Sequence, residues 1–479
     1  MKDTSIIRYI FLAGLIGLAG CTTSTSSHSL AKTTQNEVIE ATINVDSHLR
    51  EIPSYFLGFS FEKDQLETDQ FTIKNKVLEH LLKNLGTGTL RFGANTVDLM
   101  KFTGGPTLPS SCKITSTVNP AAVKAMFQFA KKVDWKVIYG LNLGCNVPLA
   151  GAYEAKFVQA ASKEELLAFE IGNEPDLFVL QGLRTNPWNV SSYIDQYNVY
   201  QKTIQKEVAG AHLSGPGLGN FITSLEWLPP FMTAESKNLT FASVHFYPTI
   251  HDYGLSPDGP LYPTIAHLLS PAKAKLIINK IFTPQVKAAK QAGLPFRITE
   301  MNSAARSGEP GVSDAFASAL WVLDYSFRFL TIGVSGINIQ NDLDNLHDIY
   351  SAIQRDKSGS YFPRPIYYGM LFFNEAAKGF LVPVEIKNED SLANFSIYSS
   401  VQQDHTLRIT VINKDPQKTL NVQIRISDKN YQSGKMIQLL APSLDAKSGI
   451  SLGGPPLILP GIGFQHRGDQ LRPSPEFFL

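Results

Sequence analysis

The sequence predicts an α/β protein, a (β/α)8 TIM barrel with an additional antiparallel β-sandwich formed by the C-terminal region and an N-terminal strand. Eight apolar, strand-like runs alternate with amphipathic segments between residues 56 and 340. Strands that alternate with helices indicate parallel βαβ units, and eight units over roughly 285 residues suit such a barrel. After residue 363, short alternating runs separated by polar turns indicate antiparallel strands instead.

The barrel strands are expected, in chain order, at 56–61, 90–92, 136–143, 166–171, 213–218, 241–246, 296–299 and 336–340. Helical periodicity is clearest at 121–133, 191–209 and 313–329. Sandwich strands are expected at 395–399, 407–411 and 422–426, with 38–45 as a candidate to join them. The predicted parts are an N-terminal strand region at 37–55, the barrel at 56–362, and the sandwich with a Pro-rich tail at 363–479.

Residues 1–21 resemble a bacterial lipoprotein signal peptide. A short basic region precedes the apolar run 9–19, which is too short to span a bilayer comfortably. The run ends in Leu18-Ala19-Gly20-Cys21, similar to the lipobox in which the cysteine is lipidated. An ordinary signal peptide that contains a cysteine is the alternative. We expect an exported protein with a flexible tether at 22–36, anchored by Cys21 to a bacterial membrane, with Thr22 favouring the outer one.

Cysteine count and charge restrict the partners. Without Cys21, the chain keeps Cys112 and Cys145, and an even pair in an exported protein predicts a disulfide. Two buried free thiols are the alternative. The formal net charge of +1 gives no support for a nucleic-acid partner. The ten His and three Cys show no metal-ligand spacing, and we expect no cofactor.

Two glutamates follow buried strands in the same way. Glu174 follows the run 166–171 in the octapeptide 169–176, and Glu300 follows the run 296–299. Burial raises the pKa of such a carboxyl and favours a general acid. The carboxyl ends of barrel strands meet at one mouth, and two carboxyls there are the equipment for glycoside hydrolysis. Taken alone, Glu174 could instead cap a turn or pair with an arginine.

Polar side chains also follow most of the other strands. The first run leads to Glu62, the second to Asn95, the third to Asn142, and the sixth to His245 and Tyr247. Such side chains can bind sugar hydroxyls or tune a carboxylate. For each of them a local structural role, such as a helix cap, is the alternative.

These motifs together resemble the retaining β-glycosidases of clan A, and most closely glycoside hydrolase family 79, which holds β-glucuronidases and heparanases. The resemblance covers about residues 40 to 465. The stretches that carry it are Gly58-Phe59-Ser60-Phe61-Glu62, Leu90-Arg91-Phe92-Gly93, Glu170-Ile171-Gly172-Asn173-Glu174-Pro175, His245-Phe246-Tyr247-Pro248, Thr299-Glu300 and residues 313–321.

The resemblance implies roles for the residues around the two carboxyls. Glu174 is expected to be the acid/base and Glu300 the nucleophile, with the carboxyls about 5–5.5 Å apart. Asn173 is expected to bond the sugar 2-hydroxyl. Tyr247 is expected to donate to Glu300 and hold its orientation.

Further roles concern the sugar itself. The resemblance implies that Glu62 binds hydroxyls of the terminal sugar and that Tyr350 contacts the carboxylate of a uronic acid. Relatives often carry an aromatic residue and a glycine pair after the nucleophile, whereas this chain has the loop 301–308, in which Arg306 is a candidate to supply a charge instead. Asn95 and Asn142 are further candidates for substrate binding.

We therefore expect a retaining, exo-acting β-glucuronidase that releases terminal β-linked glucuronic or 4-O-methyl-glucuronic acid from glycans or glycosides by double displacement. A heparanase-like endo-enzyme is one alternative, although the near-neutral charge balance suits a densely anionic substrate poorly. A neutral-sugar β-glycosidase is another. A non-catalytic carbohydrate-binding lipoprotein is the third, but a binder has no need for two carboxylates that repel each other.

Overall fold

The computed structural model describes residues 38–252, 254–387, 394–427, 431, 434–453 and 456–457. The expected signal peptide, Cys21, the tether and the tail from residue 467 lie outside the described residues. Within the described part of the chain, no helix is long and apolar enough to cross a membrane.

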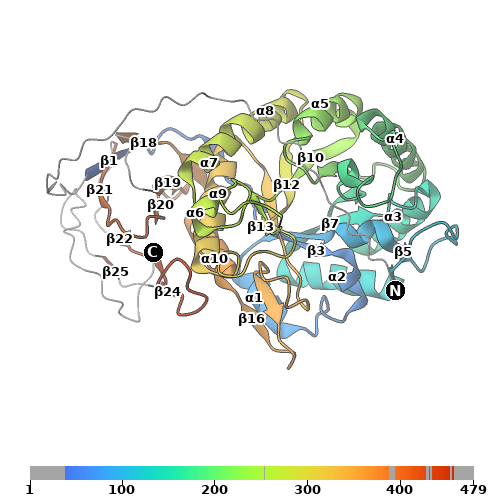
Figure 1. Cartoon of the computed structure of the whole chain (residues 1–479), viewed down its shortest axis with the longest axis horizontal. Coiled ribbons are helices and arrows are strands. Elements are labelled where there is room, and N and C mark those ends of the chain that lie inside the picture. Colours follow the sequence, from blue (N-terminus) through green and yellow to red (C-terminus); the bar gives the residue numbers. More distant parts are fainter. Residues whose placement is uncertain are drawn as a thin grey trace. The chain divides into compact units, whose positions relative to one another are not determined.

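Eight parallel strands close a barrel in the spatial order β10-β12-β14-β3-β4-β7-β8-β9 (Figure 1). They are β3 (Gly58–Glu62), β4 (Gly88–Gly93), β7 (Trp135–Leu141), β8 (Leu166–Ile171), β9 (Leu213–Leu218), β10 (Leu239–Phe246), β12 (Phe296–Met301) and β14 (Gly336–Gln340). Each corresponds to one of the eight predicted runs, and the predicted barrel is confirmed. Most of these strands are buried along nearly their whole length, which is why they appear in the sequence as continuous apolar runs.

Helices follow the strands and cover the barrel. The main helix after each strand is, in order, α1 (Lys76–Asn84), α2 (Pro120–Val133), α3 (Pro148–Ser162), α4 (Val190–Glu207), α5 (Ser224–Glu235), α8 (Thr283–Gln291), α9 (Phe316–Ile332) and α10 (Pro365–Ala376). The short α6 (Ile265–Leu268) and α7 (Pro271–Ile277) precede α8. α2 shows the local cause: Asn119 accepts the Ala122 N–H as N-cap and Pro120 occupies the first turn.

The barrel extends further along the chain than the sequence predicted. The expected end was residue 362, but α10 packs against α9 as the eighth barrel helix. Its sequence is apolar on most sides, with Ile366, Met370 and Phe373 buried in the same core as the barrel strands. The polar turns on which the boundary was predicted therefore begin only after this helix.

Two sheets, of three and four strands, form most of the additional β-structure. In one, β1 (Val38–Ile43) lies between β18 (Val384–Lys387) and β21 (Asn421–Ile426); the other has the order β2 (Arg50–Glu51), β17 (Phe380–Val382), β19 (Phe395–Val401), β20 (Leu407–Asn413). Side chains of both sheets share apolar clusters, so the sheets pack on one another. The expectation of purely antiparallel strands was wrong in one place, because β1 pairs with β21 in parallel. β1 comes from the opposite end of the chain, and no hairpin turn fixes its direction.

A buried ionic cluster joins α9 to this second part. Lys414, 1% exposed, places Nζ 2.6 Å from Oδ2 of Asp324, which also accepts from Arg328. Although burial raises it, the pKa of Asp324 lies below its usual range because of these two cations. The ring of Tyr398 stacks on Phe327 at 4.6 Å, and its hydroxyl donates to Asp324.

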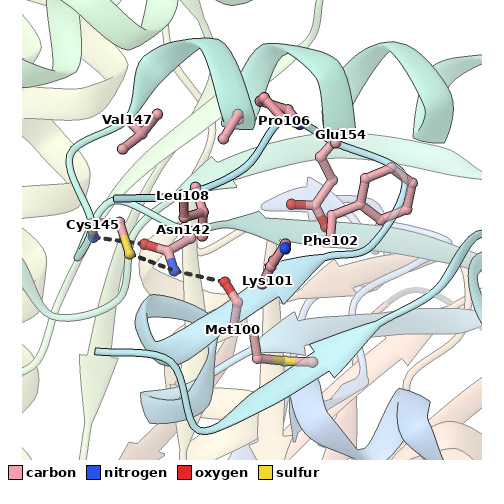
Figure 2. Close-up of a pocket in the computed structure, with 12 residues that line it drawn as sticks. Met100, Lys101, Phe102, Pro106, Leu108, Asn142, Cys145, Val147 and Glu154 are labelled. Atoms are coloured by element: carbon pink, nitrogen blue, oxygen red, sulfur yellow. Dashed lines mark hydrogen bonds between the residues drawn. The ribbon is translucent and has the colours of Figure 1, made fainter. Parts of the chain in front are cut away.

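The predicted disulfide is absent from the structure, in which Cys112 and Cys145 are both free. The two thiols are neighbours that interact as hydrogen-bonding groups, and the Cys145 sulfur also accepts from Asn142 Nδ2 at 3.8 Å (Figure 2). Burial, and then the Cys112 thiol, raise the pKa of Cys145 to about 12. Proximity of the two cysteines was thus foreseen correctly, whereas the covalent bond was not.

Candidate active site

Glu174 stands just beyond β8 on a sharply turned backbone. Gly172 has φ 77°, and Glu174 has φ 52° and ψ 53°. This is the left-handed backbone conformation, which residues other than glycine rarely adopt. Pro175 then starts the 3₁₀ turn η3 (Pro175–Leu177). Gly219, just beyond the adjacent strand β9, leaves the room that the carboxyl occupies, since a Cβ there would lie 2.5 Å from Glu174 Cδ.

Glu300 lies within β12 at its end, beside His245 of β10. The register between β10 and β12 shifts between Val244 and His245, and that between β12 and β14 shifts between Ile298 and Met301. Such irregularities re-aim side chains at barrel rims. One ligand atom each of Glu174, His245 and Glu300 lies within 4.8 Å of the others. Donors of these types could also ligate a metal ion. The sequence placed all three residues at strand ends of one mouth but showed no metal-ligand spacing.

Burial controls the protonation of Glu174. The side chain is 13% exposed, and burial raises its pKa to about 7, although the charge of Arg91 lowers it. His245 Nδ1 lies 2.9 Å from Glu174 Oε1. Burial also lowers the pKa of His245 to about 4, so the imidazole is neutral at neutral pH. Glu174 therefore holds a proton without a cationic partner at hydrogen-bond distance among the described residues.

Glu300 has the opposite surroundings. Its Oε2 accepts from Arg91 Nη1 at 2.9 Å and its Oε1 accepts from the Tyr247 hydroxyl at 2.7 Å. Burial and the nearby Glu300 raise the pKa of Tyr247 well above its usual value, which keeps that hydroxyl a donor. A charge-assisted bond to a guanidinium stabilises the ionised carboxylate. The contact between Tyr247 and Glu300 is the one that the sequence resemblance implied.

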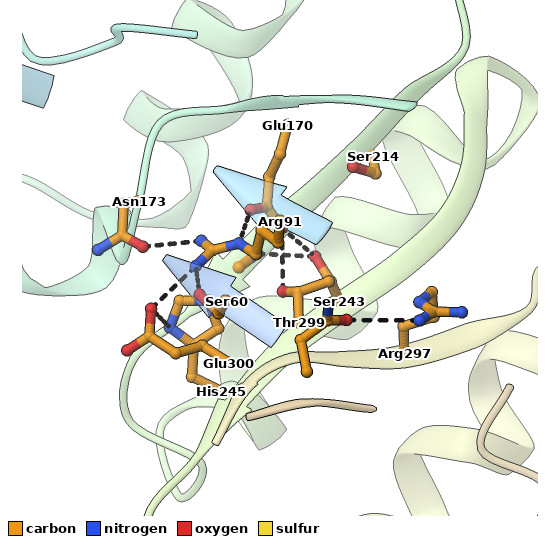
Figure 3. Close-up of polar contacts among 12 residues, drawn as sticks. Ser60, Arg91, Glu170, Asn173, Ser214, Ser243, His245, Arg297, Thr299 and Glu300 are labelled. Carbon is orange, nitrogen blue, oxygen red and sulfur yellow. Dashed lines mark hydrogen bonds and ion pairs between the residues drawn. The ribbon is translucent and has the colours of Figure 1, made fainter. Parts of the chain in front are cut away.

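Arg91 is the centre of the network in Figure 3. The guanidinium donates to Glu300, to Ser60 Oγ at 2.9 Å, to Asn173 Oδ1 at 2.8 Å and to Glu170 Oε2 at 2.6 Å. Both Arg91 and Glu170 have fully buried side chains. Although burial lowers it, the pKa of Arg91 is raised by the two carboxylates, and the residue stays charged.

Glu170 is held on its other side by two hydroxyls. Its Oε1 accepts from Ser243 at 3.1 Å and from Thr299 at 3.0 Å. Burial raises the pKa of Glu170, but the charge of Arg91 lowers it by more, so this pKa lies below its usual value. Sequence reasoning gave no role to Arg91 or Glu170. The available signal was a charged residue in the middle of an otherwise apolar strand, which a buried strand accommodates only if the charge is paired.

Three of the predicted substrate-binding residues lie in or beside this site. Asn173 is 1% exposed, and its Oδ1 is occupied by Arg91, so its NH2 group is the part left for a ligand. Glu62 ends β3 and accepts from the Thr96 N–H at 2.7 Å; burial, with a contribution from Glu300, raises its pKa to about 8. The ring of Tyr350 lies 6.4 Å from that of Tyr247.

The other three predicted binding residues have different contacts. Asn95 is exposed, at the start of the turn η2 (Asn95–Leu99), and contacts Gln181. Asn142 donates to Met100 O at 2.8 Å and accepts from the Cys145 N–H, which is the local structural role left open above. It lines a small hollow of about 20 Å³ between β5 (Met100–Phe102) and α3, which neither Glu174 nor Glu300 lines (Figure 2). The Arg306 guanidinium is 46% exposed and pairs with Asp252.

No known protein-family profile matches the chain. The chain is 25% identical to a β-glucuronidase of Neurospora crassa over 418 residues, which cover 76% of this chain and 72% of that protein. It is 26% identical to a β-glucuronidase of Aspergillus niger over 291 residues, or 53% of this chain and 50% of that protein.

Among solved structures, the fold is similar to a 4-O-α-L-rhamnosyl-β-D-glucuronidase from Fusarium oxysporum 12S, with TM-score 0.70, 19% identity, and coverage of 86% and 91% of the two chains. A family 51 arabinofuranosidase from Xanthomonas axonopodis pv. citri gives TM-score 0.66, 14% identity and coverage of 89% and 96%. The barrel, its paired carboxyls and these relatives define the class of protein: the chain is a glycoside hydrolase.

Proposed function

We propose that this glycoside hydrolase is a retaining, exo-acting β-glucuronidase similar to family 79, with Glu174 as acid/base and Glu300 as nucleophile. The observation that carries the proposal is the contrast between two adjacent carboxyls. Glu174 is desolvated with a pKa of about 7, while Glu300 accepts from a guanidinium and a phenol. Environments that separate the protonation states of two carboxyls assign the acid and the nucleophile.

The first half-reaction follows from this contrast. Glu300 attacks the anomeric carbon and forms a glycosyl ester, while Glu174 gives its proton to the departing glycosidic oxygen. In the tautomer with a proton on Nδ1, His245 donates to Glu174 Oε1, and the other carboxyl oxygen carries the acid proton. Asn173, fixed by Arg91, turns its NH2 group to the sugar 2-hydroxyl.

The second half-reaction reverses the roles. Once the charge of Glu300 is consumed in the ester, Glu174 is an ionised base that takes a proton from water. The water oxygen attacks the anomeric carbon, the ester bond breaks, and Glu300 leaves as a carboxylate. Two inversions give net retention of the anomeric configuration.

Preference for a uronic acid is supported by the two named β-glucuronidase relatives and by Tyr350. This tyrosine is 7% exposed beside Tyr247, and its hydroxyl bonds to none of the described residues. It is therefore available to donate to a sugar carboxylate. Glu62, protonated at neutral pH, is available to donate to a sugar hydroxyl. Arg306 points to Asp252 and plays no part in the proposal.

Sugar preference is tested with p-nitrophenyl β-glucuronide, β-glucoside and β-xyloside at equal concentration. We expect kcat/KM to be highest for the glucuronide. Preference for either neutral sugar would contradict the uronic acid assignment. Turnover of glucuronide polymers without release of terminal glucuronic acid would support the heparanase-like alternative, and no turnover of any substrate would support a carbohydrate-binding protein.

Mechanism is tested with Glu300→Gln and Glu174→Ala. Glu300→Gln is expected to abolish turnover, and substantial residual activity would contradict the assignment of Glu300 as the nucleophile. Glu174→Ala should regain activity with azide on an activated aglycone, yielding a β-glycosyl azide. An α-glycosyl azide, or no rescue, would contradict the retaining mechanism.

We also propose that the protein is exported and lipid-anchored through Cys21. The support is the sequence Leu18-Ala19-Gly20-Cys21 after an apolar run. Replacing Cys21 with Ser should release the protein from the membrane fraction. Continued membrane association of Cys21→Ser, or no acyl mass on the wild-type N-terminus, would contradict the proposal.

A further inference from the structure

One buried carboxylate ties together three neighbouring strand ends at the mouth of the barrel. Asp98, 2% exposed, lies in the turn η2 that follows β4. Its Oδ1 accepts the N–H groups of Leu143 and Gly144, both at 2.8 Å, just beyond β7. Its Oδ2 accepts the N–H of Asn173 at 2.8 Å, just beyond β8. β4, β7 and β8 are consecutive in the barrel, so the carboxylate spans two strand gaps.

Gly144, one of the residues whose N–H groups Asp98 accepts, lies in close contact with the backbone of Asp98. A Cβ on Gly144 would lie 2.4 Å from the backbone oxygen of Asp98 and 2.9 Å from its Cβ. Only glycine lets the turn after β7 approach so closely. Burial raises the pKa of Asp98 to about 6 although the three N–H groups lower it, so the group is an ionised acceptor at neutral pH.

The segment that Asp98 holds needs external support. Gly172 and Glu174, on either side of Asn173, both have left-handed backbones. A non-glycine residue in that region costs of order 1 kcal/mol or more and persists only where its surroundings fix it. Glu174 N–H donates to Gly217 O at 2.9 Å and Arg91 fixes the Asn173 side chain. The Asn173 backbone itself is fixed by Asp98.

We propose that Asp98 is a positioning residue, which acts through the backbone of Asn173 to aim the carboxyl of Glu174 at the departing glycosidic oxygen. This inference rests on the proposed role of Glu174 as acid/base. A displacement of about 1 Å in a catalytic group can cost on the order of 100-fold in rate. The displacement matters only for leaving groups that need a proton.

The test compares leaving groups in Asp98→Asn. The amide keeps the size of the side chain but turns an NH2 group toward at least one of the three N–H donors. Substrates are the phenyl and 2,4-dinitrophenyl β-glycosides of the sugar that wild type hydrolyses best. We expect kcat/KM for the phenyl glycoside, relative to the dinitrophenyl glycoside, to fall at least about 10-fold, because the activated phenolate leaves without protonation. A purely structural role would lower both values together.

Gly144→Ala is the second variant, because it presses on Asp98 without changing its charge. Asp324→Asn is the matched control: Asp324, on α9, is 3% exposed and charged, but it accepts from Lys414, which follows β20. The ratio of kcat/KM for the phenyl glycoside to kcat/KM for the dinitrophenyl glycoside should fall in Gly144→Ala and stay at the wild-type value in Asp324→Asn. An unchanged ratio in a folded Asp98→Asn or Gly144→Ala would overturn the proposal, as would failure of both to fold.

Failure of the proposed function has a different signature. If wild type prefers a neutral aryl glycoside, the glucuronidase assignment falls and the ratio is measured on that sugar. If wild type cleaves no aryl glycoside, both proposals fall.

Discussion

Replacing Arg91 with methionine should separate the stabilising and the catalytic roles of the central network. Methionine approximates the length of arginine without its donors. The change leaves Glu170, which is fully buried, with hydroxyl donors only. It also removes the guanidinium bond to Glu300 and the bond to Asn173.

The magnitude follows from these contacts. Removing one partner of a buried ion pair costs about 3–5 kcal/mol, because the other charge stays buried. The bonds to the neutral acceptors Ser60 and Asn173 add about 1 kcal/mol each. The free energy of unfolding should therefore fall by about 5–7 kcal/mol. The double variant with Glu170→Gln removes the uncompensated charge, and its stability should recover by at least about 2 kcal/mol.

Denaturant unfolding followed by tryptophan fluorescence measures these values, since Trp135 and Trp321 are buried in the barrel. Measured kcat/KM should stay low in both variants, because neither restores the donor to Glu300. Stability of Arg91→Met within 1 kcal/mol of wild type, or a double variant no more stable than the single one, would refute the reasoning.

Three other predictions concern pH, Tyr247 and Asp324. In the proposed mechanism Glu174 must be protonated, and its pKa is about 7. The value of kcat/KM for a phenyl glycoside should therefore fall as pH rises through about 7, whereas that for a dinitrophenyl glycoside should not. Tyr247→Phe removes one bond to Glu300, the proposed nucleophile, and should lower kcat about 10- to 100-fold at nearly wild-type stability; an unchanged kcat would contradict the proposed role of Tyr247. The pKa of Asp324 is lowered in the folded protein, so its contribution to stability is complete above the unfolded value of about 4 and is lost as pH falls below it. Asp324→Asn should destabilise the protein by about 3 kcal/mol at pH 7 and should weaken the fall of the melting temperature at acid pH. If the melting temperatures of variant and wild type ran parallel over the whole pH range, this prediction would be wrong.

The meeting of the two carboxyls was predictable because barrel geometry brings every strand end to one mouth. Glu174 and Glu300 follow apolar runs, and that pattern needs no knowledge of distances. Asn142 satisfied the same rule but turned to a local partner, Met100, and Arg306, predicted from the loop after Glu300, turned to Asp252. A strand end places a residue at the rim, and the rotamer and the neighbouring loop then decide which way its side chain points.

The sequence by itself determined the barrel, the eight strands and the two carboxyls, because periodicity and position along a strand are local properties. The contact of Tyr247 with Glu300 was implied only by the family resemblance. Only the tertiary structure decided how the surroundings of the two carboxyls differ. That difference depends on Arg91 of β4 reaching Glu300 of β12 and Glu170 of β8, strands that are not adjacent to β4, and on the burial of Glu174 beside a neutral His245. Likewise, Asp98 became recognisable only once three strand ends met around it. Charge pairing and desolvation act through space, and the order of residues along a chain does not contain those distances.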